Sequence, residues 1–264
     1  MSWNTHVGGG DVAALVQRLR RGDFTGDAPV ADFVLLLQEV YRRGPSVPDV
    51  GSNGGALPAP ILAQPPAGGR RDILDLARSL ALHVVYAPAM RNGPRDEDRG
   101  NAILATLPLA DLLVIELPFE RQRRIVLAAT VREPAGAAPT WQLRVATAHF
   151  DTSLAFLRGG PAAARQRQAQ ALIEALSSST APIVVAGDFN TWWGDDEPAV
   201  RDLRRAFPDA GATRPASTWG GAIRAMGALD HVFARINGRR LDVARLPERF
   251  GSDHYPLMTV IKLR

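Results

Sequence analysis

Four strand-like segments follow one another between residues 101 and 150, and no helical pattern separates them. A sheet of parallel strands needs a crossover helix between neighbours, so this succession indicates mainly antiparallel pairing. The four segments are NAILATLP (101–108), DLLVIELP (111–118), RRIVLAATVRE (123–133) and TWQLRVATAHF (140–150). The chain therefore cannot form a singly wound parallel sheet.

Segments with helical or strand-like patterns lie on both sides of this region. Helices are predicted at 11–21, 70–82, 161–178 and 197–207, and further strands at 31–40, 83–89, 181–190, 228–235, 240–247 and 254–263. Two sheets packed face to face, with helices outside, would bury the apolar side of every element. Residues 44–69 are predicted to form a long loop and residues 90–100 a polar one. No repeat or linker divides the chain, so we predict a single domain over residues 1–264.

The composition excludes several kinds of site. The chain has no cysteine, which rules out disulfide bonds, thiolate metal sites and cysteine nucleophiles. Its net charge is +4 and nearly all of its basic residues are arginines, which favours an acidic partner. A preference for arginine codons in a GC-rich genome explains the same bias. No apolar run predicts a membrane span and no signal pattern follows Met1, so a soluble protein, cytoplasmic or exported, is expected.

Several predicted strands end in an acidic, amide or histidine side chain. Glu39 follows FVLLLQ, His149 ends VATAH, and Asp188 and Asn190 follow VVAG. A carboxylate inside a core is costly unless it is paired, whereas at the end of a strand it can face a shared cleft. Each residue alone also fits a turn, surface or core position. Together they offer oxygen ligands for Mg²⁺ or Mn²⁺ and histidines for proton transfer or oxyanion stabilisation.

The order of these motifs resembles that of the endonuclease/exonuclease/phosphatase family, which includes deoxyribonuclease I, apurinic/apyrimidinic endonucleases, bacterial sphingomyelinases and inositol polyphosphate 5-phosphatases. The motifs are WN (3–4), LLLQEV (35–40), RGNAIL (99–104), TAHFDT (147–152), GDFN (187–190), LDHVF (229–233) and GSDHYPL (251–257). The resemblance spans essentially the whole chain. It implies an α/β (α+β) fold of the deoxyribonuclease I type, a four-layer sandwich of two packed mixed β-sheets flanked by helices.

The resemblance also implies a metal site. Glu39 matches the glutamate that binds the divalent metal in this family, and Asn4 matches the asparagine that helps to hold metal and phosphate. Asp253 would be a further acid on the metal side. The expected cofactor is Mg²⁺ or Mn²⁺.

Four residues take catalytic roles by the same resemblance. Asp188 would orient or deprotonate the attacking water, and His254 would stabilise the charge that develops on phosphate. Asp230 would hold the imidazole of His254 charged and oriented. His149 would be a second phosphate contact or the acid for the leaving group.

Further residues are expected to contact substrate. Asn190 would contact the scissile phosphate, and the two-residue period of a strand places it on the same face as Asp188. Asn101 would line the same cleft. Arg91 and Arg99 would act as a phosphate clamp, unless the loop that carries them is simply solvated.

The resemblance thus predicts a divalent-metal-dependent phosphoesterase, in first place a phosphodiesterase or nuclease that hydrolyses P–O bonds by in-line attack of water. Two alternatives stay open: a sphingomyelinase-like or inositol-phosphate hydrolase, and a non-catalytic binding protein on the same fold. The expected partner is a phosphate-ester substrate, with nucleic acid among the candidates, and the expected state is a monomer. Trp192, Trp193 and Trp219 offer a stacking surface for bases or pack in the core.

Several features bear on the branch of the family or depart from its pattern. His6 stands where apurinic/apyrimidinic endonucleases carry an acid, and His149 is absent from that branch, so both residues disfavour it. His231 is interpreted as a histidine at the rim of the site without a chemical role. Only two residues precede Trp3. We therefore expect a short first strand and a weakly held Asn4, with room for residues upstream of Met1.

Overall fold

The computed structural model describes residues 1–43, 70–91, 97–133, 141–152, 159–211, 217–220 and 228–262. The predicted loop 44–69 lies outside these residues. The strands are β1 (Ser2–Asn4), β2 (Val34–Arg43), β3 (His83–Arg91), β4 (Glu97–Ala105), β5 (Leu109–Glu116), β6 (Ile125–Arg132), β7 (Gln142–His149), β8 (Ile183–Asp188), β9 (Asp230–Arg235), β10 (Ala244–Arg245) and β11 (Leu257–Met258). The helices are α1 (Val12–Arg21), α2 (Ile73–Ser79), α3 (Gly160–Ser177), α4 (Pro198–Ala206) and the short 3₁₀ helix η2 (Gly194–Asp196).

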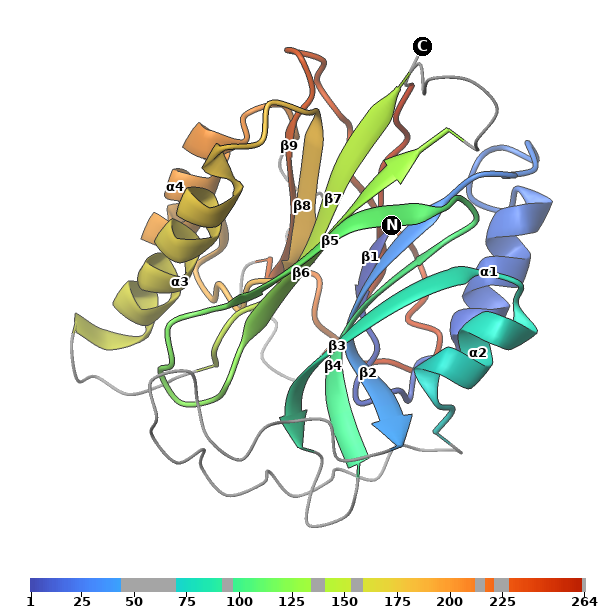
Figure 1. Ribbon diagram of the computed structural model, residues 1–264, viewed down its shortest axis with the longest axis horizontal. Helices are drawn as coiled ribbons and strands as arrows, with labels where there is room; N and C mark the ends of the chain where they lie inside the picture. Colours follow the sequence, from blue (N-terminus) through green and yellow to red (C-terminus); the bar gives the residue numbers. More distant parts are fainter. Residues whose placement is uncertain are drawn as a thin grey trace.

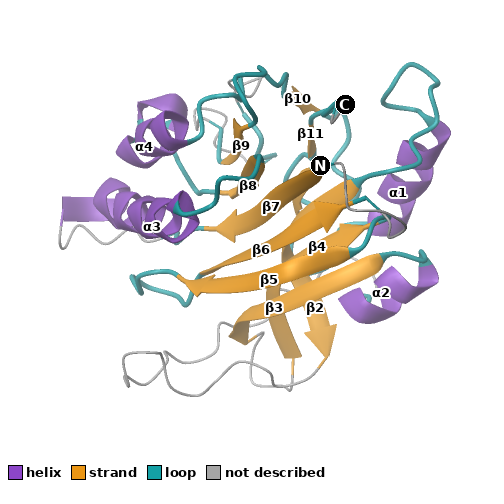
Figure 2. Cartoon of the chain, turned by 45° about the horizontal axis from the view of Figure 1, so that its top comes forward, coloured by secondary structure: helices purple, strands orange, loops and turns teal. Residues whose placement is uncertain are grey.

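The strands form two mixed sheets that pack face to face (Figures 1 and 2). The first sheet has the order β10-β11-β1-β2-β4-β3 and the second the order β5-β6-β7-β8-β9. Within them β1 pairs with β2 and β7 with β8 in parallel, whereas the other neighbours pair antiparallel. The predicted four-layer sandwich is confirmed. Of the four successive strands predicted to pair antiparallel, β5, β6 and β7 do so with one another, whereas β4 lies in the other sheet and pairs antiparallel with β2 and β3.

The helices cover the outer faces of the sandwich. In Figure 1, α1 and α2 lie on one side and α3 and α4 on the other. Helix α1 shows why these segments fold as helices: Val12, Leu15, Val16 and Leu19 recur at helical spacing and are buried against the first sheet. Asp11 caps its amino end, since its side chain accepts the N–H of Ala14. None of the described helices is long and apolar enough to cross a membrane.

The last two strands are shorter than predicted. The segments 240–247 and 254–263 contribute only the two-residue strands β10 and β11. Pro247 and Pro256 flank these pairs, and proline has no N–H to extend a ladder. Conversely, the predicted polar loop 90–100 is partly strand, because β3 runs to Arg91 and β4 begins at Glu97.

Candidate active site

A cleft of about 380 Å³ opens where the ends of strands from both sheets meet. Eight predicted site residues line it: Asn4, Glu39, Arg99, His149, Asp188, Asn190, Asp253 and His254. Asp230 lies behind His254 and contacts its ring. Residues that are up to 250 positions apart, from Asn4 to His254, therefore share one site.

Glu39 reaches the cleft because β2 contains a β-bulge. Pairing with β4 is regular up to Leu37 and resumes at Val40 after a register shift. Glu39 has a φ of 51°, in the left-handed region that non-glycine residues seldom adopt. The bulge sends two neighbours in different directions, since Gln38 is buried and donates to Thr147 Oγ1 at 2.8 Å, whereas Glu39 lines the cleft. Backbone strain of this kind is typical of functional sites.

The GDFN segment ends β8 and holds a buried carboxylate. Asp188 is 2% exposed. Its Oδ2 accepts a hydrogen bond from Asn4 Nδ2 at 2.9 Å, and its Oδ1 accepts one from the backbone N–H of Asn190 at 3.0 Å. A β-carbon at Gly187 would lie 1.9 Å from the carbonyl oxygen of Ala148 on β7. Glycine is therefore required where the two parallel strands approach the site.

Asn190 reaches the cleft by a route that differs from the predicted one. Strand β8 ends at Asp188, so the alternation of strand side chains does not extend to Asn190, whose φ is 50°. The chain turns instead, with the Asp188 side chain accepting the backbone N–H two residues on, as in an Asx turn. Asn190 Nδ2 donates to Phe150 O at 3.0 Å, which fixes its amide at the cleft wall.

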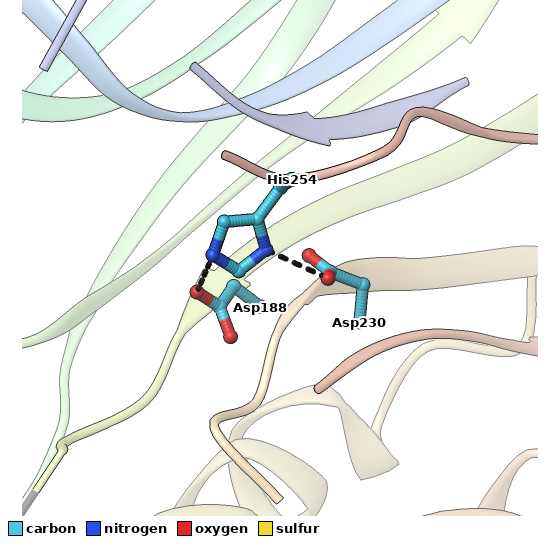
Figure 3. Close-up of side chains that lie close together, drawn as sticks. All are labelled: Asp188, Asp230 and His254. Carbon is cyan, nitrogen blue, oxygen red and sulfur yellow. Dashed lines mark hydrogen bonds and ion pairs between the residues drawn. The ribbon is translucent and has the colours of Figure 1, made fainter. Parts of the chain in front are cut away.

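His254 lies between two buried carboxylates (Figure 3). Its Nδ1 is 2.8 Å from Asp230 Oδ2, and its Nε2 is 3.7 Å from Asp188 Oδ2. Burial opposes the charged imidazolium, but the two carboxylates outweigh it and raise the pKa of His254 to about 10. Burial also raises the pKa of Asp188 to about 7, against the charge of His254. The arrangement thus offers a cationic donor beside a carboxylate that can exchange a proton near neutral pH.

Segments from both ends of the chain hold these residues in place. Trp3 Nε1 donates to the backbone oxygen of His254 at 3.0 Å. Ser252 Oγ donates to the backbone oxygen of Asn4 at 2.7 Å and accepts the N–H of His254 at 3.1 Å. Asn4 Oδ1 accepts the N–H of His6 at 3.0 Å, and Asn4 itself is 3% exposed. Asn4 is firmly held, contrary to the prediction from the short first strand.

His149 is buried beside an arginine that the sequence analysis missed. Arg124 Nη1 lies 2.8 Å from Nδ1 and 3.1 Å from Nε2 of the ring. Burial, together with the charges of Arg124 and Arg99, holds the pKa of His149 well below its usual range. His149 Nε2 lies 3.8 Å from Glu39 Oε1 and 3.6 Å from Asp188 Oδ2. A neutral ring at this position suits a hydrogen-bonding role better than that of an acid.

The carboxylate of Asp253, at the cleft wall, accepts hydrogen bonds from two donors. His6 Nδ1 lies 2.7 Å from its Oδ1, and Trp219 Nε1 donates to its Oδ2 at 3.1 Å. Burial works against the charge of Asp253, but the hydrogen bond from His6 and the charges of His254 and His6 outweigh it and hold the pKa below its usual range. The same hydrogen bond raises the pKa of His6. Asp253 therefore stays ionised and organises the histidines of this wall.

Two predicted substrate contacts do not line the cleft. Asn101 is fully buried between the sheets, where its Nδ2 donates to the backbone oxygens of Ile125 at 3.1 Å and Thr147 at 3.3 Å. It joins β4 to the second sheet. Arg91 ends β3 opposite Asp98 of β4 and is not among the residues that line the cleft.

Sequence reasoning missed further residues of the cleft. Arg121, Gln122 and Arg124 come from the turn between β5 and β6, and Leu229 completes the apolar part. The signal was the basic run RQRR (121–124) directly before an apolar strand. The predicted strand 123–133 includes the last two arginines of this run, although β6 begins only at Ile125.

His231 does not lie at a rim, as predicted, but in the core. It is 1% exposed, and its ring stacks on Phe233 with a centroid distance of 5.6 Å. Thr191 Oγ1 donates to Ala228 O and lies 2.7 Å from His231 Nε2, so the ring donates through Nε2–H. Among the described residues, its buried Nδ1 has no hydrogen-bond partner. Burial lowers the pKa of His231 to about 4.

This burial predicts a loss of stability in acid. The unfolded chain takes up a proton on His231 near pH 6.5, whereas the folded protein resists it until about pH 4. The neutral His231 therefore contributes fully to the free energy of unfolding above pH 6.5. This contribution, about 3 kcal/mol, is lost as the pH falls towards 4. Urea unfolding at pH 7 and pH ~4.5 should show a smaller loss for His231→Gln, which can still donate to Thr191 but does not titrate. Equal losses for the variant and the wild type would contradict this assignment.

The donors at the floor of the cleft fit a hard divalent cation. The carboxylates of Glu39 and Asp188 and the amide oxygen of Asn4 are oxygen ligands of the kind that Mg²⁺ and Mn²⁺ prefer. Arg99 Nη1 occupies only one oxygen of Glu39, at 3.2 Å. The ligand atoms of Asp188, Asp230 and His254 lie within 4.8 Å of one another. This second cluster fits a metal less well, because a protonated imidazole has no lone pair to donate.

A model of the Endonuclease/Exonuclease/phosphatase family matches residues 1–254 of the chain. The protein belongs to this family. The identification made from the ordered motifs is thereby confirmed, and the match includes every residue placed in the cleft. Members of the endonuclease/exonuclease/phosphatase family generally hydrolyse phosphate esters, which supports a hydrolase of the phosphoesterase type.

Solved structures share the fold at low sequence identity. An endonuclease/exonuclease/phosphatase family protein from Leptotrichia buccalis C-1013-b has a TM-score of 0.63 and 12% identity, with 99% of this chain and 98% of that chain covered. Sphingomyelinase C from Streptomyces griseocarneus has a TM-score of 0.53 and 17% identity, with 98% and 97% covered. The human Nocturnin catalytic domain, which holds a sulfate anion, has a TM-score of 0.51 and 16% identity, with 86% and 81% covered.

Curated relatives match a smaller part of the chain. A UPF0294 protein of Vibrio vulnificus (strain YJ016) is 33% identical over 100 residues, which make up 37% of this chain and 34% of that protein. A UPF0294 protein of strain CMCP6 matches with the same values. The matched region thus spans about a third of these relatives, and they add no assignment to the cleft.

Proposed function

We propose that the protein is a divalent-metal-dependent phosphodiesterase that hydrolyses a P–O bond by in-line attack of water. The observation that carries this proposal is the convergence of Glu39, Asp188 and His254 in one cleft, from β2, β8 and the segment before β11. Oxygen ligands, a carboxylate base and a cationic donor are the groups that such a hydrolysis needs. Family membership adds independent support.

Glu39 and Asn4 would hold the cation at the floor of the cleft. Bound Mg²⁺ or Mn²⁺ would neutralise the phosphate and help the leaving oxygen to depart. Arg99, which pairs with Glu39 at 3.2 Å, keeps that carboxylate in place. The bulge at Glu39 supplies the backbone direction that this position requires.

Asp188 would orient and deprotonate the attacking water. Its pKa of about 7 suits a general base, because such a group is ionised in part and still accepts a proton effectively. Asn4 and Asn190 hold its two oxygens at 2.9 and 3.0 Å. The base is therefore fixed before substrate binds.

His254 would stabilise the negative charge that grows on the phosphate oxygens. Asp230 holds its Nδ1 at 2.8 Å, so that Nε2–H points towards Asp188 and the cleft. His149 is assigned to a phosphate contact rather than to the leaving-group acid, because its lowered pKa leaves the ring neutral at neutral pH, with one N–H that can donate a hydrogen bond but is not an effective acid.

The side chains in the walls of the cleft indicate which class of phosphate ester would bind there. Trp192 and Trp219 line it together with arginine side chains, a combination that suits a base stacked beside a phosphate. A sphingomyelinase-like activity is the second candidate. Two exposed aromatic side chains favour it, Phe119 at 42% and Trp193 at 56% exposed. They lie close in sequence to Arg121 and Trp192, which line the cleft.

A substrate panel tests the proposed function. Plasmid DNA, RNA, an aryl phosphodiester, sphingomyelin vesicles and inositol phosphates should be offered with Mg²⁺, with Mn²⁺ and with a chelator. We expect hydrolysis of a nucleic acid or aryl phosphodiester that falls by about 100-fold or more with chelator and returns when metal is restored. A preference for vesicles would favour the lipid candidate. No hydrolysis of any ester would instead indicate a binding protein.

A further inference from the structure

Arg124 is a buried cation without a carboxylate partner. Its side chain is 2% exposed although it adjoins the cleft. Glu39, Asp151 and Asp188 are near enough to favour its charge, but within the described part of the chain no acid forms an ion pair with it. Its Nη1 contacts only the ring of His149, and its Nε has no hydrogen-bond partner there. Burying a guanidinium without a hydrogen-bonded anion is unfavourable, and an anion bound in the cleft would reduce this cost.

Arg99 makes the contrast clear. It lines the same cleft, is almost as deeply buried and likewise has an Nε without a hydrogen-bond partner among the described residues, but its Nη1 is paired with a carboxylate, Glu39 Oε2, at 3.2 Å. Arg124 keeps its binding capacity, because a neutral imidazole is a weaker partner than a carboxylate. Burial lowers the pKa of Arg124 only to about 10, so the side chain stays charged at neutral pH.

The turn that carries Arg124 is held rigidly. Leu117 N donates to the backbone oxygen of Arg124 at 2.9 Å and closes the hairpin. The buried Asp151 accepts the backbone N–H groups of Arg121 at 2.9 Å and Gln122 at 2.7 Å. A rigid loop with a buried, incompletely paired cation at a cleft is prepared for an anionic ligand.

Helix α3 braces the same turn from the other side. Gln168 Nε2 donates to Pro118 O at 2.9 Å, and its Oε1 accepts the N–H of Asp151 at 2.9 Å. Arg167 and Glu120 form a bidentate pair at 2.8 Å for both contacts. Because the turn is fixed in advance, the position of Arg124 does not depend on substrate to order it.

We propose that Arg124 is a phosphate-binding residue of the cleft, whose guanidinium holds the phosphate of the substrate while Nη1 fixes the ring of His149. This assignment rests on the proposed function, because it takes the ligand of the cleft to be a phosphate ester. A guanidinium can bind two phosphate oxygens at once, and this geometry suits the trigonal spread of charge in the transition state.

Binding of inorganic phosphate, measured by calorimetry without any turnover, tests the proposal. We expect Arg124→Gln to weaken phosphate binding by roughly 10- to 100-fold, since one charge-assisted contact is lost. Arg124→Lys keeps the charge but not the planar fork, so it should lie between Arg124→Gln and the wild type. Arg78→Gln, at a side chain 76% exposed on α2, is the matched control and should bind as the wild type does.

Each outcome tests the role of Arg124 in phosphate binding independently of the activity assay. A folded Arg124→Gln that binds phosphate as tightly as the wild type would overturn the proposal, as would a wild type that binds none. If Arg124→Gln does not fold, Arg124→Lys decides: weakened binding supports the role, and unchanged binding overturns it. If the proposed function fails on every ester, the phosphate affinities still report on Arg124. On a substrate that is hydrolysed, the variants should lower kcat/KM in the same order.

Discussion

Replacement of Asp188 by asparagine should abolish most turnover while the fold is retained. The variant keeps the size of the side chain and can still accept the N–H of Asn190, but it cannot take a proton from water. Loss of a general base lowers the rate by roughly 10²- to 10⁴-fold. Initial rates on whichever ester of the panel is hydrolysed, compared at equal metal concentration, measure the effect.

The stability of the same variant should not follow its activity. Burial raises the pKa of Asp188 to about 7, which means that the charged form is disfavoured where it lies. Asparagine removes that buried charge, which offsets the mismatched contact with Asn4 Nδ2 and the lost ion pair with His254, so the melting temperature should change little. Asp75→Asn, at a side chain 70% exposed on α2, should change neither quantity. Wild-type turnover by Asp188→Asn would remove Asp188 from the mechanism.

The general architecture could be predicted because it follows from local patterns. Four strand-like segments without intervening helices indicated hairpins, and four amphipathic segments supplied the outer layers. The side chains of Glu39, Asp188 and His254 could be placed together because each follows or interrupts an apolar strand, where a carboxylate or imidazole can reach a cleft. The ordered motifs then indicated which strand ends share one site.

The remaining features depend on tertiary contacts that no local pattern encodes. Asn101 belongs to the motif RGNAIL (99–104), which predicted a position in the cleft. The packing of the two sheets instead turns its side chain inward, where it donates to backbone oxygens. His231 follows the polar Asp230, but its ring is enclosed by Phe189 and Phe233. Arg124 lies within the predicted strand 123–133, and only the turn before β6 brings it to His149.

The backbone geometry of the site also could not be predicted from the sequence. Glu39 depends on a bulge opposite β4, and Asn190 depends on an Asx turn after β8. Both residues have positive φ values, 51° and 50°, which the three-dimensional context imposes on side chains that would otherwise avoid them. Strict strand alternation therefore gave a wrong reason for the position of Asn190.

Metal binding should depend on Glu39 more than on any other side chain at the floor of the cleft. Glu39→Gln removes the charge of the proposed ligand but keeps its length, and Arg99 then loses its ion pair. Affinity should fall by at least roughly 10- to 100-fold, because even residues behind the ligands of a metal have effects of this size. Glu248→Gln, at a side chain 56% exposed, is the matched control.

Calorimetric titration of Mn²⁺ into the wild type, Glu39→Gln and Glu248→Gln tests most directly whether residues from both sheets converge on a single divalent cation. One site of equal affinity is expected in the wild type and in Glu248→Gln, with a large loss in a Glu39→Gln protein whose circular dichroism is unchanged. A folded Glu39→Gln that binds Mn²⁺ as tightly as the wild type, or a wild type that binds no Mn²⁺, would contradict a metal centre in this cleft.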